Sequence, residues 1–137
     1  MKRATPRKPA KSLPSARGRQ TSSQIAVKRV YDPPDSSDGL RILIDRLWPR
    51  GLSKAELKLD AWPKELSPSN ELRKWYGHDP KLYAEFGRRY RSELAAHKDD
   101  LAALRAMIKG RPATLLTATR ELDLSHASVL RELLKKA

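Results

Sequence analysis

The sequence predicts a single α/β domain, with a small, mostly parallel sheet flanked by helices and a disordered basic tail before it. Three observations lead to this class. Short apolar segments with strand character, at residues 25–30, 40–47 and 113–118, alternate with segments of helical periodicity. The run Ile42 to Ile44 is apolar on both faces, as in a central parallel strand. The last strand leads through a loop into a well-marked helix, which is typical of parallel α/β folds.

The first 24 residues predict the tail. They hold seven of the 29 basic residues, three prolines and no acidic residue, with almost nothing large and apolar. Such a segment cannot bury enough apolar surface to offset its ordering entropy. Residues 25–137 keep 22 basic against 16 acidic residues, so about half of the net charge of +13 belongs to the tail. We expect either an electrostatic contact with nucleic acid or another polyanion, or a solubilising extension without a partner.

The first half of the domain, residues 25–137, predicts two strands joined by a polar loop. Residues 25–30 form the first strand, which the pair Pro33-Pro34 stops. Residues 40–47 form the second. Ser53 and Glu56 then have the spacing of a capping box, which predicts a helical turn. Residues 57–62 alternate again and predict either a third strand or extended chain.

The second half predicts four helices, with the buried strand at 113–118 before the last of them. A short helix covers residues 70–76, and a longer one begins at Asp79-Pro80, which suits the cap and first position of a helix. A third helix ends at Gly110. The residues expected to start or cap these helices are Ser69, Asp79, Asp99 or Asp100, and Asp123 or Ser125.

The composition excludes several classes of protein and site. The chain has no cysteine, which removes disulfides, thiolate nucleophiles and sulfur-ligated metals, and a reducing cytoplasm is expected. No apolar run approaches the roughly 18 residues of a membrane span, so no membrane partner is expected. Three dispersed histidines make no convincing metal site, and no nucleotide-binding glycine motif is present, so we predict no metal and no cofactor.

Side chains that could bind a ligand gather where the predicted strands end. The segment from Asp45 to Gly51 holds an aspartate, two arginines and a tryptophan that a buried strand alone does not require. The carboxyl ends of parallel strands meet at one edge of a sheet, so we expect residues from all three exits to share a rim. Arginine forks and a helix N-terminus favour an anionic ligand, a phosphate-bearing small molecule or nucleotide. The predicted ligand-binding residues are Tyr31, Arg46, Trp48, Arg50, Arg120 and Ser125.

His126 and Asp45 are the candidates for acid–base catalysis, because imidazole titrates near neutrality. Each has a structural alternative. His126 could be a helix cap or a satisfied core residue, and Asp45 could pair with an arginine only to fix the turn. Trp48 could likewise fold under the loop as a core residue. Whether the ligand is transformed, and in which oligomeric state, stays open.

The domain also resembles a known family over residues 29–137. The motifs that carry the resemblance are Arg29-Val30-Tyr31-Asp32, Asp38-Gly39 with Arg41, Asp45-Arg46-Leu47-Trp48-Pro49-Arg50-Gly51, Trp62 with Lys64-Glu65-Leu66, Pro68-Ser69 with Glu71-Leu72-Arg73-Lys74, Thr114-Leu115-Leu116 and His126-Ala127. On these motifs the chain is identified as a member of the YeaO-like family of bacterial proteins, a domain of unknown function (DUF488). The resemblance implies the domain and supplies no reaction. Relatives carry a basic residue and Asp before Asn-His-Ala, where this chain has Arg120-Glu121 and then Ser125-His126-Ala127.

Two other functions remain as alternatives to a small-ligand site. In the first, the protein is associated with nucleic acid, and the tail and rim contact backbone phosphates. The basic side of the long helix, with Arg88, Arg89, Arg91 and Lys98, is then part of that surface, although a solvated helix face is the favoured explanation of these residues. In the second, the protein is a partner-binding module without a ligand and exposes an apolar patch.

Deletion of residues 1–24 is expected to leave the melting temperature of the domain unchanged, because the segment has no apolar side chains to pack. Thermal unfolding of the full and truncated chains in one buffer measures this. A clear drop in the melting temperature of the truncated chain would show that the segment is part of the fold.

Overall fold

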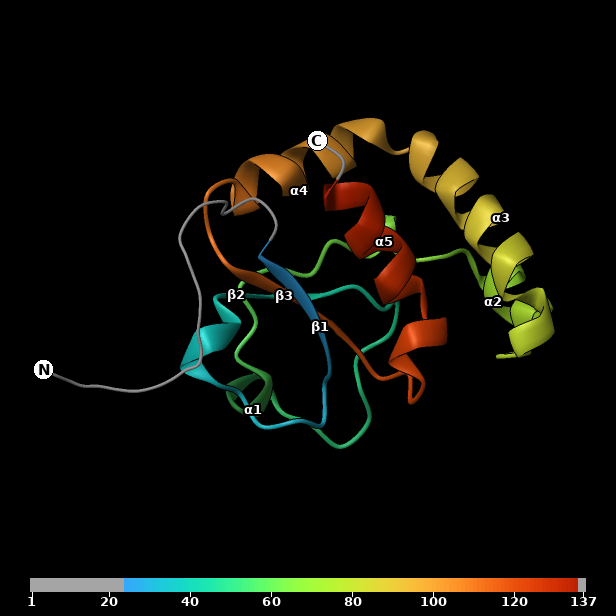
Figure 1. Cartoon of the computed structure of the whole chain (residues 1–137). Helices are drawn as coiled ribbons and strands as arrows, with labels where there is room; N and C mark the ends of the chain where they lie inside the picture. The colour runs from blue at the N-terminus through green and yellow to red at the C-terminus, as the bar shows by residue number, and fades with distance from the viewer. Residues whose placement is uncertain (1–23, 136–137) are drawn as a thin grey trace, which may run out of the picture.

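The computed structural model describes residues 24–135 and confirms the α/β class with a small parallel sheet (Figure 1). Of the predicted tail, residues 1–24, only Gln24 lies within the described residues. Its backbone carbonyl accepts a hydrogen bond of 3.0 Å from the N–H of Ala113, at the start of the third strand. None of the helices in the described part of the chain is both long enough and apolar enough to cross a membrane.

The sheet has three parallel strands, β1 (Ile25–Arg29), β2 (Leu40–Leu43) and β3 (Ala113–Thr117), in the order β1-β3-β2. Leu115 of β3 faces Val27 of β1 and Ile42 of β2 in the register. All five residues of β3 are buried, which explains why its sequence is a compact run without polar alternation. Because the strands are parallel, all three carboxyl ends lie at the same edge of the sheet.

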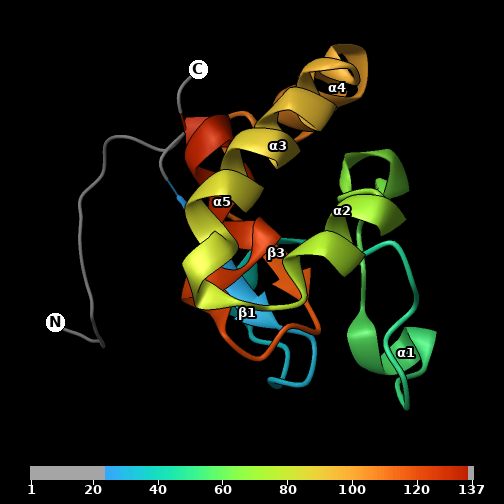
Figure 2. The same ribbon diagram turned by 90° about the vertical axis from the view of Figure 1, so that its right-hand side faces the viewer.

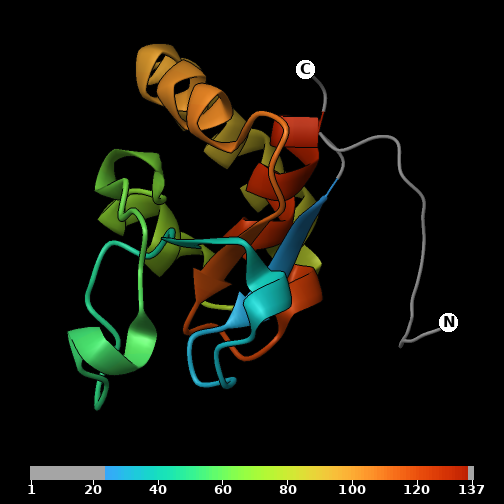
Figure 3. The same ribbon diagram turned by 90° about the vertical axis from the view of Figure 1, so that its left-hand side faces the viewer.

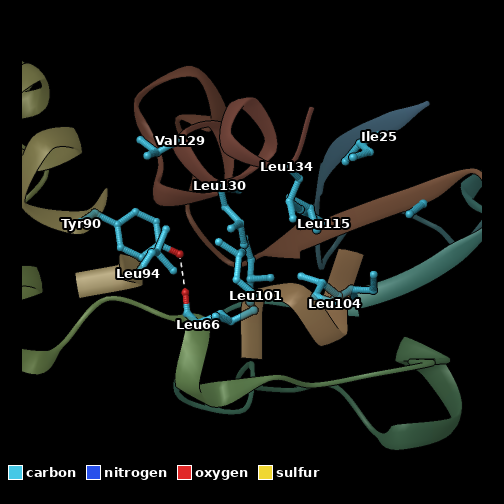
Figure 4. Close-up of a cluster of buried hydrophobic side chains, with 14 of the residues drawn as sticks. Ile25, Leu66, Tyr90, Leu94, Leu101, Leu104, Leu115, Val129, Leu130 and Leu134 are labelled. Atoms are coloured by element: carbon cyan, nitrogen blue, oxygen red, sulfur yellow. Dashed lines mark hydrogen bonds between the residues drawn. The ribbon is translucent and has the colours of Figure 1, made fainter. Parts of the chain in front are cut away.

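One face of the sheet packs against four helices, α2 (Asn70–Tyr76), α3 (Tyr83–Ala95), α4 (Lys98–Ile108) and α5 (His126–Lys135). Figure 1 shows α5 lying over the strands, with α3 and α4 forming an arc beyond it. Figure 4 shows the core between them, where Leu115 of β3 meets Leu130 of α5 and the hydroxyl of Tyr90 donates to the carbonyl of Leu66. Burial of these apolar side chains is the main stabilising contribution.

The other face carries a smaller cluster. Leu43 and Leu116 pack there against Leu57 of α1 (Lys54–Leu57), and the side chains of Trp48 and Trp62 cover them. Figures 2 and 3 show α1 and α5 on opposite sides of the sheet. Short 3-10 turns complete the fold at Ser36–Asp38, Lys64–Leu66, Pro80–Leu82 and Leu122–Leu124.

The structure corrects the predicted extent of the second strand, because β2 ends at Leu43 and not at Leu47. Ile44 still donates its N–H to the carbonyl of Leu116 at 3.1 Å. At the next position the Asp45 carboxylate, rather than the backbone, accepts the N–H of Ala118 at 2.8 Å. A side-chain oxygen therefore takes the place of the next backbone acceptor in the ladder between β2 and β3, and the backbone after Ile44 is free to turn away from the sheet.

Two further elements differ from or refine the sequence predictions. Residues 57–62 do not form a strand, and only a single parallel bridge joins Ala61 to Ile42. Helix α4 begins at Lys98 and not at an aspartate cap, because His97 occupies the cap position without a capping side-chain bond. Asp99 and Asp100 lie in its first turn, where negative charge suits the helix dipole.

The connection from β1 to β2 is held against β3 at Gly39. Gly39 has φ +65°, and a Cβ built there would lie 2.1 Å from the carbonyl oxygen of Pro112. The N–H of Leu40 donates to that same oxygen at 3.0 Å. Beside it, buried Asp38 forms ion pairs with Arg41 and Lys28. Only glycine satisfies both the backbone conformation and the close approach.

Substitution Gly39→Ala is expected to lower the free energy of unfolding by more than about 3 kcal/mol, since it adds a backbone clash to the strain of a left-handed conformation. Gly51→Ala is the matched control, because Gly51 has φ +83° and open space around its Cβ position. It should cost only about 1–2 kcal/mol. Denaturant unfolding compares the two, and equal losses would contradict the close approach.

Candidate functional site

A cavity of about 770 Å³ opens at the edge of the sheet where the three strands end. Its lining comes from the exits of β1, β2 and β3, from the start of α5 and from the end of α2. All eight residues singled out from the sequence lie around it: Tyr31, Asp45, Arg46, Trp48, Arg50, Arg120, Ser125 and His126. The structure thus brings them together, while their roles in binding or catalysis stay predictions.

Asp45 is the centre of the polar network at this edge. Its carboxylate accepts the N–H of Ala118 at 2.8 Å, the hydroxyl of Thr117 at 2.7 Å and Nε2 of His126 at 2.9 Å. Its backbone carbonyl accepts the indole N–H of Trp62 at 2.7 Å. Asp45 therefore joins the exit of β2 to β3, to α5 and to the segment that follows α1. These contacts, and not the ion pair with an arginine that the sequence offered as an alternative, hold the Asp45 carboxylate.

The surroundings of Asp45 keep its carboxylate charged. Burial raises the pKa of the carboxyl, but the hydrogen bond and charge of His126, with the donors of Ala118 and Thr117, lower it by more. The net pKa lies below the ordinary value of 3.8. Asp45 is thus an acceptor for protein donors at neutral pH, which favours a role in holding His126 over a role as a general acid.

His126 is the first residue of α5, in the position expected from sequence. Its Nε2 lies 2.9 Å from the Asp45 carboxylate and 3.1 Å from the carbonyl oxygen of Ile44. Ser125 caps the helix, since its hydroxyl accepts the N–H of Ser128 at 3.4 Å and donates to the carbonyl of Leu122 at 2.6 Å. The ring of Tyr90 meets the imidazole edge to face at 6.1 Å. The imidazole is therefore fixed by several contacts, with 13% of its side chain exposed.

Arg46 and Trp48 shape one wall. The Arg46 guanidinium donates to the carbonyls of Ser67 and Pro68 at 3.2 and 3.3 Å, which ties the exit of β2 to the segment before α2. Trp48 donates its indole N–H to the carbonyl of Leu52 at 2.6 Å and packs edge to face on Trp62 at 5.4 Å. Trp48 therefore belongs to the small core cluster as well as to the cavity wall.

Arg50 and Arg120 lie at the mouth of the cavity and are exposed. The backbone carbonyl of Arg50 accepts the hydroxyl of Tyr31 at 3.0 Å, so the exits of β1 and β2 are joined there. Neither guanidinium forms an ion pair within residues 24–135. Both are thus available to an anion in the cavity.

Sequence reasoning missed the contribution of α2. Arg73 and Lys74 on this helix, and His78 just after it, line the cavity beside Tyr76. The hydroxyl of Tyr76 donates to the carbonyl of Leu124 at 2.7 Å, which holds the end of α2 over the loop after β3. The argument from strand exits could not find these residues, because α2 follows no strand exit and reaches the cavity only through tertiary packing. The signal that could have found Arg73 and Lys74 is the family motif Glu71-Leu72-Arg73-Lys74.

Comparison with known proteins agrees with the motifs. The family model described as the inactive DUF488-N3 subclade matches residues 24–137. The uncharacterized protein YeaO of Escherichia coli (strain K12) is 47% identical over 111 residues, which cover 81% of this chain and 96% of that protein. The chain belongs to the YeaO-like DUF488 family.

Relatives also occur in mycobacteria. The uncharacterized proteins Mb3100c of Mycobacterium bovis and Rv3073c of Mycobacterium tuberculosis are each 43% identical to this YeaO-like chain over 112 residues, 82% of this chain and 94% of theirs. No solved structure matches the chain. The expected family is confirmed, and the names of these relatives indicate no ligand and no reaction.

The substitution Asp45→Asn is expected to lower the free energy of unfolding at neutral pH by about 2 kcal/mol, because it weakens charge-assisted hydrogen bonds. The pH dependence should change too. The lowered pKa means that the contribution of Asp45 is complete above 3.8 and is lost as the pH falls below that value.

Denaturant unfolding of the wild type and of Asp45→Asn, from neutral pH down to about pH 2, measures both effects. The variant should lose less stability on acidification than the wild type. Asp123→Asn, at an exposed aspartate without a side-chain hydrogen bond in the described structure, is the control and should follow the wild type. Parallel curves for all three would contradict the network.

Proposed function

We propose that this YeaO-like protein binds a small phosphate-bearing molecule, such as a nucleotide, in the cavity at the strand exits. The observation that carries the proposal is the charge of the lining. Five cationic side chains surround the cavity, and none of them pairs with a carboxylate within residues 24–135: Arg46, Arg50, Arg73, Lys74 and Arg120. Of the two acids in the lining, Asp45 is occupied by His126, Thr117 and Ala118, which leaves Glu121. Such an excess favours an anion.

Size and shape support a small ligand over a polymer. The cavity volume of about 770 Å³ lies in the range of small-molecule sites, which runs from about 300 to 1,000 Å³. The start of α5 adds backbone N–H groups and the positive end of a helix dipole. Aromatic side chains of Tyr76 and Trp48 in the lining offer apolar surface to a base or other ring.

The basic face of α3 supports nucleic-acid binding less well. Arg88 and Arg89 both form ion pairs with Glu85, at 2.5 and 3.0 Å, and Arg89 lies over the ring of Trp75. Two of the three arginines of this face are thus held by contacts within the protein, and the Glu85 carboxylate compensates one of the three charges. A partner-binding surface has little support either, because two of the exposed large apolar side chains of the described residues, Tyr31 and Leu47, belong to the cavity lining.

The description of the matching family model as inactive favours binding without turnover. The Asp45 carboxylate also accepts three hydrogen bonds from the protein itself, which suits a structural role better than proton transfer to a ligand. We propose the cytoplasm as the location, since a chain without cysteine suits a reducing compartment.

A thermal-shift screen of inorganic phosphate, nucleotides and sugar phosphates tests the proposal on the full chain. A ligand at one hundred times its dissociation constant stabilises the fold by about 2.7 kcal/mol. Arg120→Ala should weaken the affinity for a hit by about tenfold, because a charge-assisted hydrogen bond is lost. Arg111→Ala removes an exposed arginine just before β3, at the opposite end of the sheet, and should leave the affinity unchanged.

Salt titration distinguishes binding of a small phosphate-bearing ligand from binding of a polynucleotide. Affinity for a polynucleotide falls steeply with salt, because many condensed counterions are released. A small ligand that meets a few cations should show a much shallower dependence. The proposed site would be contradicted if no phosphate compound stabilised the fold. It would also be contradicted if Arg120→Ala and Arg111→Ala lost the same affinity for a hit.

A further inference from the structure

The protonation of His126 is restricted by its two neighbours. Nε2 lies 3.1 Å from the carbonyl oxygen of Ile44 and 2.9 Å from the carboxylate of Asp45. Both partners can only accept a hydrogen bond, so Nε2 carries the hydrogen. Nδ1 is therefore the nitrogen on which the ring gains or loses its second proton.

Nδ1 is open to the cavity. His126 lines the cavity, and no residue from 24 to 135 forms a hydrogen bond with Nδ1. Nδ1 is also not fully buried. In this part of the chain the side-chain nitrogens that are both fully buried and without a partner belong to Arg29, Arg41, Arg105 and Arg131, and Nδ1 of His126 is not among them. A ligand that fills the cavity can therefore meet Nδ1 directly.

The charges around the ring link its protonation to an anion. The Asp45 carboxylate contacts the ring at Nε2 and leaves Nδ1 to a ligand. Tyr90 contacts the imidazole through its aromatic ring alone, because its hydroxyl donates to the carbonyl of Leu66. The other ionisable groups of the lining are Tyr31, Arg46, Arg50, Arg73, Lys74, Tyr76, His78, Arg120 and Glu121. Their excess of positive charge attracts an anion, and an oxygen of that anion can accept a hydrogen bond from Nδ1.

We propose that His126 is a proton-linked ligand contact, which takes up a proton from solvent at Nδ1 and donates it in a hydrogen bond to an oxygen of the bound anion. This inference rests on the proposed function and adds its regulation by pH. Binding draws the ring toward its charged form, so the affinity for a dianion rises as the pH falls through the range where imidazole titrates.

Inorganic sulfate is the probe, because it stays a dianion while phosphate itself takes up a proton in this range. Its dissociation constant is measured on the full chain between about pH 8 and pH 5.5. For the wild type we expect about tenfold tighter binding at the acidic end, where imidazole is charged. Calorimetry in two buffers of different ionisation enthalpy should show proton uptake on binding.

Two variants locate the proton. In His126→Gln the amide nitrogen can keep the Nε2 contacts to Asp45 and Ile44, while the group at Nδ1 is removed. Sulfate affinity should then vary little with pH. His78→Asn is the matched control, because His78 also lines the cavity and asparagine tolerates its φ of +59°. This variant should keep the pH dependence of the wild type.

The outcomes separate this inference from the proposed function. Sulfate binding that depends on Arg120 but has the same affinity at both ends of the pH range, without proton uptake, would overturn the role of His126 alone. The same follows if His126→Gln keeps the wild-type pH dependence or if His78→Asn loses it. If no anion binds at any pH, both proposals fall. If the glutamine variant does not fold, NMR signals of the His126 ring in the wild type, recorded with and without sulfate, decide the matter: protonation of this ring on binding supports the inference, and an unchanged ring contradicts it.

Discussion

The contacts of Asp45 are the constraint on which the site depends. The Asp45 carboxylate, just after β2, accepts hydrogen bonds from the end of β3 and from the first residue of α5. The backbone carbonyl of the same residue accepts the indole N–H of Trp62. These four contacts end the β2 ladder, turn the chain out of the sheet and fix the imidazole of His126. The hydrogen bonds to the carboxylate offset the cost of burying its charge. One of them comes from the imidazole of His126, a group that can itself be charged.

The same arrangement explains how the cavity can hold uncompensated positive charge. The arginines after β2 and β3 and the basic residues of α2 keep much of their hydration at an open mouth, so they require no carboxylate partners. Arg46 is the exception, because its guanidinium lies against the carbonyls of Ser67 and Pro68. The fold thus separates a hydrogen-bonded floor, built on Asp45, from a cationic rim that an anion can neutralise.

Local pattern predicts the parts of this site that follow strands. Tyr31, Asp45 and Arg120 lie directly after apolar segments, and parallel strands bring such positions to one edge. The end of β2 was predicted too late, since a side chain that replaces a ladder acceptor leaves no mark on hydrophobic periodicity. Arg73 and Lys74 escaped prediction because only the contact of Tyr76 with Leu124, across 48 residues of sequence, carries α2 to the rim.

The most direct measurement of the central claim is the mapping of backbone amide signals by NMR while inorganic pyrophosphate is added to the full chain. The account predicts that the largest changes fall at the cavity, in residues 45–50, 73–78 and 118–127. The N–H groups at the start of α5 should respond most strongly, because the proposal places the anion at that end of the helix. Changes confined to residues remote from the cavity, or spread evenly over exposed basic side chains, would contradict it.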